Sequence, residues 1–93
     1  LLALSPGTQQ APRELEIIRE PSLLVLPCRE AAQAYFKAQD ITTYQWSASH
    51  KTRGNVLLVD GRLRLEGGKD VRVRCQLARG GRLGNMELEI TGP

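Results

Sequence analysis

Apolar and polar residues alternate along most of the chain after residue 13, and a period of two is typical of β-strands that bury one face. Short alternating runs occur in "ELEII", "SLLVLPC", "TYQW", "VRVRCQL" and "MELEI". A longer run, "VLLVDGRLRL", contains Asp60-Gly61, a dipeptide that favours a two-residue hairpin because both turn positions accept positive φ. The pattern predicts about seven strands, with Leu58 facing Leu63 inside this hairpin.

Residues 29–40, "REAAQAYFKAQD", depart from the alternation. Ala31, Ala34 and Tyr35 recur at helical spacing, and alanine is the strongest helix former. This segment is predicted to be a loop that carries a short helical turn between two strands. The alternative is an extended continuation of the strand through Cys28.

The same alternation places a small set of side chains in the predicted core. These are Leu26, Tyr44, Trp46 and Val73. On the opposite side of the last two strands, Arg72 and Arg74 are expected beside Glu87 and Glu89, because consecutive strands are usually antiparallel neighbours.

The length of 93 residues indicates one domain. Residues 1–12 include "SPGTQQAP", which has the composition of a flexible leader, so the folded domain is expected over residues 13–93. No run of 18 apolar residues occurs, and membrane insertion by this domain is not expected.

Cys28, Trp46 and Cys75 occur in the order Cys, Trp, Cys at inward-facing positions of the predicted strands. This arrangement resembles the immunoglobulin superfamily, in which an indole packs on a disulfide between two sheets. The resemblance covers Arg13 to Gly92 and is similar to the compact constant-like or intermediate sets. It implies an all-β immunoglobulin-like sandwich of about seven antiparallel strands, with one inter-sheet disulfide between Cys28 and Cys75. The tyrosine that usually precedes the second cysteine by two residues is absent.

The redox state of the cysteines decides between two environments. In an oxidising compartment they form the bridge, whereas an intracellular module of the same family holds them as buried thiols. The spacing does not match a metal knuckle or a redox motif, and His50 is the single histidine, so neither a metal nor a cofactor is expected.

One candidate site is an apolar patch on the outer face of the predicted sheet, because apolar side chains beside arginine are typical of interface centres. Its members are Leu23, Val25, Leu57, Val59, Arg62 and Arg64. The alternative is that arginine stems, the leader or a neighbouring domain cover these residues.

A second candidate site reflects the uneven charge. Residues 51–82 carry nine Lys/Arg against three Asp/Glu. The basic residues of the predicted loops are Lys51, Arg53, Arg79 and Arg82. They would attract an acidic partner, such as a sulfated glycan or an acidic protein surface, or form a solvated rim without a partner. Nucleic acid is not expected, because stacking proteins interleave aromatic residues with basic ones.

No set of residues indicates catalysis, since there is no nucleophile motif and no pair of pocketed carboxylates. The resemblance implies a non-catalytic protein–protein recognition module of an extracellular or cell-surface receptor or adhesion protein. Its partner would be a cell-surface protein or a neighbouring domain of the same chain. The alternatives are an intracellular structural spacer and a binder of acidic glycan through the basic loops.

Overall fold

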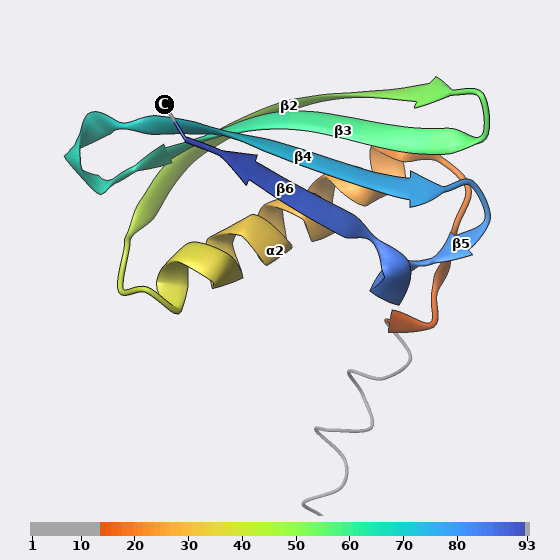
Figure 1. Cartoon of the computed structure of the whole chain (residues 1–93), viewed down its shortest axis with the longest axis horizontal. Helices are drawn as coiled ribbons and strands as arrows, with labels where there is room; N and C mark the ends of the chain where they lie inside the picture. Colours follow the sequence, from red (N-terminus) through yellow and green to blue (C-terminus); the bar gives the residue numbers. More distant parts are fainter. Residues whose placement is uncertain (1–13, 93) are drawn as a thin grey trace, which may run out of the picture.

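One helix and antiparallel strands make up the fold in a computed structural model that describes residues 14–92 (Figure 1). The leader predicted for residues 1–12 lies outside the described residues. The elements, in chain order, are β1 (Ile17–Ile18), the 3-10 helix η1 (Pro21–Leu24), α2 (Val25–Lys37), β2 (Thr43–Arg53), β3 (Val56–Leu65), the 3-10 helix η2 (Glu66–Gly68), β4 (Asp70–Ala78), β5 (Gly81–Arg82), the 3-10 helix η3 (Leu83–Asn85) and β6 (Glu87–Thr91).

Four strands form one antiparallel sheet in the order β2-β3-β4-β6, and α2 lies across one of its faces (Figure 1). Strands β1 and β5 form a separate two-stranded sheet. The predicted all-β immunoglobulin-like sandwich is therefore wrong. A sandwich packs two sheets face to face, whereas a helix covers the four-stranded sheet here.

Helix α2 includes the segment that was expected to be a strand through Cys28. Leu24, Cys28, Ala32 and Phe36 recur every fourth residue and form one buried stripe against the sheet. The helical turn expected within residues 29–40 is thus part of a longer helix. Both the strand through Cys28 and its extended continuation are wrong.

Strand β3 is continuous, so the hairpin predicted at Asp60-Gly61 is wrong. The two-residue turn lies instead at Gly54-Asn55, between β2 and β3, where Gly54 takes the positive φ of 61° that such turns require. Gly61 serves a different purpose, because a side chain at this position would overlap the indole ring of Trp46. The glycine therefore allows the indole to lie directly on the sheet.

The core fills the space between α2 and the sheet. Its buried residues are Ile18, Leu24, Cys28, Ala32, Phe36, Leu57, Val59, Leu63, Leu65, Val71, Val73, Cys75 and Leu77. Trp46 is half-buried against this cluster. Leu26 (53% exposed) and Tyr44 (60% exposed) lie outside it, so their assignment to the core is wrong. Leu26 is on the solvent side of a helix, and Tyr44 falls where the β2–β3 register shifts, between Thr43 and Trp46.

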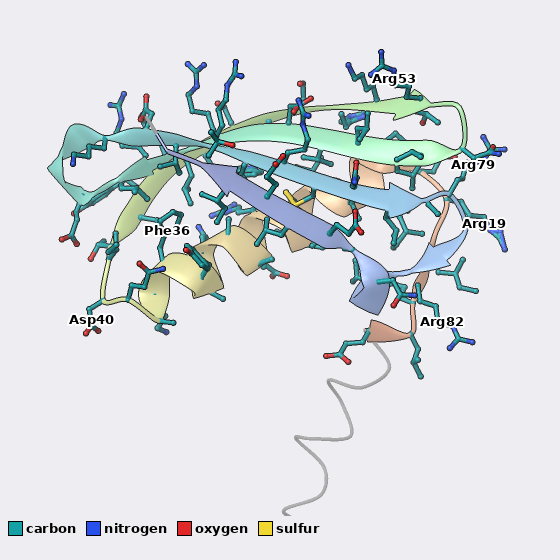
Figure 2. All side chains as sticks on the ribbon, viewed as in Figure 1. Arg19, Phe36, Asp40, Arg53, Arg79 and Arg82 are labelled. Atoms are coloured by element: carbon teal, nitrogen blue, oxygen red, sulfur yellow. A yellow bond between two sulfur atoms is a disulfide. The ribbon has the colours of Figure 1, made fainter. Side chains whose placement is uncertain are left out.

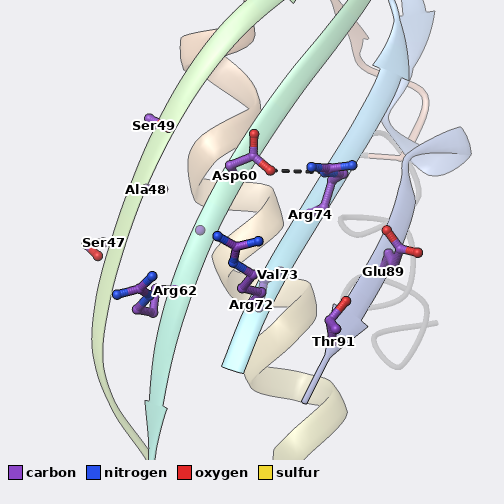
Figure 3. A pocket seen from close by; sticks show the side chains of 11 residues that line it. Ser47, Ala48, Ser49, Asp60, Arg62, Arg72, Val73, Arg74, Glu89 and Thr91 are labelled. Atoms are coloured by element: carbon purple, nitrogen blue, oxygen red, sulfur yellow. Dashed lines mark hydrogen bonds and ion pairs between the residues drawn. The ribbon is translucent and has the colours of Figure 1, made fainter. Parts of the chain in front are cut away.

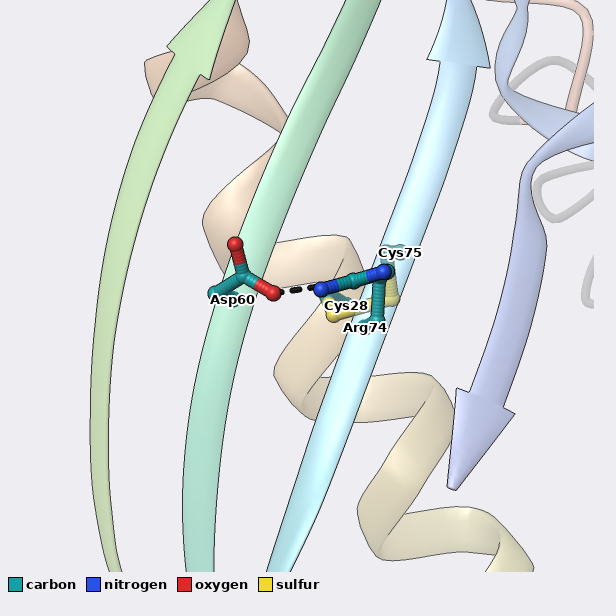
Figure 4. Close-up of polar contacts among 4 residues, drawn as sticks. All are labelled: Cys28, Asp60, Arg74 and Cys75. Carbon is teal, nitrogen blue, oxygen red and sulfur yellow. Dashed lines mark hydrogen bonds and ion pairs between the residues drawn. A yellow bond between two sulfur atoms is a disulfide. The ribbon is translucent and has the colours of Figure 1, made fainter. Parts of the chain in front are cut away.

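The predicted pairing of Cys28 with Cys75 is confirmed, with the two Cα atoms 5.9 Å apart. The bridge joins α2 to β4 and not one sheet to another (Figure 4). It therefore attaches the helix to the middle of the sheet that the helix covers.

Candidate functional site

The predicted apolar patch does not exist as one surface. Leu57 and Val59 are fully buried against α2, because the continuous β3 turns its odd-numbered residues toward the helix. Leu23 is exposed on η1, and Val25 is half-buried at the start of α2. The two arginines of the patch project from the opposite side of the sheet, so its apolar and basic members are separated.

The side of the sheet turned away from α2, called the outer face below, is polar. Residues opposite one another in an antiparallel ladder project to the same side, and the alternation of burial in β3 and β4 identifies that side. Its polar residues are Ser47, Ser49, Lys51 and Arg53 of β2; Asp60, Arg62 and Arg64 of β3; Asp70, Arg72, Arg74 and Gln76 of β4; and Glu87, Glu89 and Thr91 of β6.

Two ion pairs cross from β3 to β4 on the outer face. The Arg64 Nε donates to the Asp70 Oδ1 at 3.0 Å, and the Arg74 Nε donates to the Asp60 Oδ1 at 3.0 Å. Figure 4 shows the second pair on the side of the sheet away from the disulfide. Each of these arginines therefore has a carboxylate partner directly across the ladder.

A third cross-strand pair lies between these two. Here Arg62 of β3 is opposite Arg72 of β4, and neither forms an ion pair with any residue in 14–92. The pairing expected for the last two strands is only partly present, since Arg74 is opposite Glu89 but Arg72 is opposite Thr91. The alternation predicted a glutamate beside Arg72, and this prediction is wrong because the partner of Arg72 depends on the exact register of β4 and β6.

Arg62 and Arg72 line a shallow hollow of about 740 Å³ on the outer face (Figure 3). Its lining residues are Ser47, Ala48, Ser49, Asp60, Gly61, Arg62, Arg72, Val73, Arg74, Glu89 and Thr91. The hollow thus combines guanidinium groups, hydroxyls and two carboxylates on one open surface.

The pKa of Asp70 is lowered, mainly by the hydrogen bond from Arg64, and attraction to Arg64 and Arg62 adds to this effect while partial desolvation opposes it. Because the folded-state pKa lies below the ordinary value of about 3.9, this pairing stabilises the fold above that pH. The contribution is lost as the pH falls through the lower, folded value.

We expect Arg64→Gln to raise the pKa of Asp70 in an NMR titration of its carboxyl carbon, and Arg79→Gln to leave it unchanged. Equal values in Arg64→Gln and the parent protein would contradict this assignment.

Arginines gather at the end of the molecule that holds the β2–β3 hairpin (Figure 2). They are Arg19, Arg53, Arg79 and Arg82, called the basic end below, and all four are exposed. Three separate contacts bring their segments together. The N–H of Arg79 donates to the carbonyl of Asn55 (2.7 Å), the N–H of Gly80 donates to the carbonyl of Ile18 (2.8 Å), and Ile17 pairs with Arg82.

The predicted basic loops are thus partly strands. Lys51 and Arg53 lie on β2, Arg82 lies on β5, and only Arg79 is in a turn. Arg19 was not predicted, because only the β1–β5 pairing brings it to this end. None of the four arginines of the basic end forms an ion pair with the described residues, although exposed Glu16 and Glu20 belong to the same segment as Arg19.

Within residues 14–92 no group of three or more His, Cys, Asp or Glu side chains is placed to hold a metal ion. The same part of the chain has no buried polar or charged side chain, and His50 is exposed on β2. No helix there is both long enough and apolar enough to cross a bilayer. Among the described residues, the outer face and the basic end are the two surfaces on which charged side chains gather.

Comparison with protein-family models, with curated proteins and with solved structures found no match.

Proposed function

We propose that this chain is a non-catalytic binding domain that holds an acidic glycan, sulfated or carboxylated, at its basic end. The observation that carries the proposal is the convergence of Arg19, Arg53, Arg79 and Arg82 from distant segments, all exposed and without ion pairs in the described structure. Guanidinium groups donate paired hydrogen bonds to sulfate and carboxylate groups. The disulfide supports an extracellular or other oxidising compartment.

An acidic glycan fits this end better than the other partners considered. The aromatic side chains lie on α2 and in the first half of β2, away from the β2–β3 hairpin, so stacking with bases has no support at the basic end. Recognition of a protein through the predicted apolar patch loses its basis, because Leu57 and Val59 are buried.

Heparin is the probe that tests the proposal, with dextran as the neutral comparison and polyglutamate as the acidic-protein comparison. The double variant Arg53→Gln/Arg79→Gln should bind heparin roughly ten-fold more weakly, since an exposed ion pair contributes about 0.2 to 1 kcal/mol and the variant loses two of them. The measurement is titration calorimetry at two salt concentrations, and binding by the parent protein should fall steeply with salt.

The matched control is Lys37→Gln/Lys69→Gln, which removes the same charge from two exposed residues that belong to neither the basic end nor the outer face. An equal loss of heparin affinity in this control would show that only net charge matters and would reject the basic end as the site. Binding to polyglutamate as tight as to heparin would move the assignment to an acidic protein surface.

A further inference from the structure

One row of residues crosses all four strands of the outer face at the same level. Ser47 is opposite Arg62, Arg62 is opposite Arg72, and Arg72 is opposite Thr91. Directly opposite residues in such a ladder have Cβ atoms about 5 Å apart, so one anion above the sheet lies within reach of both long arginine side chains. The row therefore presents two guanidinium groups between two hydroxyl groups.

The rows on either side show how the sheet usually balances its charges. In one row Arg64 is matched by Asp70, and in the other Arg74 is matched by Asp60. Like charges directly opposite one another destabilise a sheet. Arg62 and Arg72 form such a pair, and no carboxylate among residues 14–92 compensates it by an ion pair. A bound anion would supply the missing charge.

The shape of the surface agrees with a ligand at this point. Arg62, Arg72, Ser47 and Thr91 all line the hollow of about 740 Å³, which is within the range of small-molecule sites. Figure 3 shows Arg74 turned toward Asp60, while Arg62 and Arg72 extend over the neighbouring strands, and neither forms an ion pair with the described residues.

We infer that the Arg62–Arg72 pair is a binding site for a dianionic tetrahedral oxyanion, such as the phosphoryl group of a phosphate monoester. Two guanidinium groups balance two negative charges and donate paired N–H groups to the oxygens. A carboxylate carries one charge and would leave one arginine uncompensated. Ser47 and Thr91 are three strand spacings apart, about 14 Å, so their hydroxyls contact the polar body of the ligand and not the phosphoryl group.

Glu89 limits where the anion can lie. It lines the same hollow and is opposite Arg74, which already forms an ion pair with Asp60. Its carboxylate repels an anion from that side of the hollow. The oxyanion is therefore held over the Arg62–Arg72 row itself.

This site is independent of the basic end. Arg53 is six residues beyond Ser47 on β2, which corresponds to about 20 Å in an extended strand. The two proposals can therefore fail separately.

The test is a titration of the full chain with inorganic phosphate, followed through the arginine Nε–H resonances by NMR. We expect the Arg62 and Arg72 resonances to shift with a Kd of about 1 mM. Arg62→Gln and Arg72→Gln should each weaken phosphate binding by about ten-fold. Arg29→Gln, with the same loss of charge on α2, should change it less than about two-fold. Sulfate should bind as phosphate does, and acetate at equal ionic strength about ten-fold more weakly.

Two further variants distinguish a loss of phosphate binding from a folding defect. Arg72→Lys keeps the charge but loses the paired donors, so it should bind phosphate less tightly than the parent protein and more tightly than Arg72→Gln. Glu89→Gln removes a repelling carboxylate and should tighten phosphate binding. Three results would each overturn the assignment: equal binding of acetate and phosphate, a defect in Arg29→Gln as large as that in Arg62→Gln, or weaker binding by Glu89→Gln.

Discussion

Replacing Cys28 and Cys75 together with alanine should lower the free energy of unfolding by about 4 kcal/mol. The bridge spans a sequence separation of 47 residues, and closing a loop of this length removes that much conformational entropy from the unfolded chain. Both cysteines are fully buried, so the variant also loses packing between α2 and β4. The measurement is urea unfolding followed by the fluorescence of Trp46, the one tryptophan in the chain.

Reduction provides the control for this prediction. A reducing agent should destabilise the parent protein and leave the alanine variant unchanged. Protein from an oxidising secretory host should resist thiol alkylation until it is reduced, as intact mass would show. Alkylation of both cysteines on denaturation without reduction would instead favour an intracellular module and remove the argument for an oxidising compartment.

Leu57→Ala should cost about 3 to 4 kcal/mol of unfolding free energy, because Leu57 is fully buried and the truncation leaves a cavity under α2. Leu58, the next residue, is half-buried on the opposite side of β3, so Leu58→Ala should cost less than about 1.5 kcal/mol. The two variants remove the same atoms from neighbouring positions. Urea unfolding of both therefore isolates the effect of the face on which each leucine lies.

The order of the two effects tests the register of β3. A hairpin at Asp60-Gly61 places Leu58 inside and Leu57 outside, so it requires the opposite order. A larger loss in Leu58→Ala than in Leu57→Ala would therefore restore the hairpin and contradict the continuous strand.

The sequence was sufficient to predict which residues of β4 are buried. In β4 the alternation of Val71, Val73 and Cys75 with polar residues predicts the observed burial, because a strand with one covered face has a period of two. The disulfide pairing was also correct. Its inter-sheet placement was wrong because it came from the immunoglobulin resemblance, which specified where the cysteines lie.

The helix was missed because two periodicities coincide before residue 29. Leu24, Leu26 and Cys28 alternate like a strand, but Leu24 and Cys28 are also four residues apart and continue to Ala32 and Phe36. A stripe of four residues at a spacing of four is the stronger pattern. The sequence contained this signal, and the shorter alternation concealed it.

The error in β3 arose from a local signal that tertiary contacts override. Asp60-Gly61 favours a turn in isolation, yet Gly61 is needed so that Trp46 can lie on the sheet, and Asp60 is needed to pair with Arg74. Such contacts between separate strands are not visible in a short sequence window. For the same reason the pairing of Arg62 with Arg72, and the position of Arg19 at the basic end, required the structure.

Strands β2 and β6 are the two edge strands of the four-stranded sheet, and no described strand pairs with the free edge of either one. A free edge can pair with another molecule, but charged side chains and irregular register oppose such edge-to-edge association. On β2 these features are Lys51, Arg53 and the shift between Thr43 and Trp46. A polyanion bound at Arg53 would neutralise part of this protection. If the chain binds an acidic glycan as proposed, dense loading along one long glycan would favour strand-to-strand association between neighbouring copies, and binding would be linked to self-assembly.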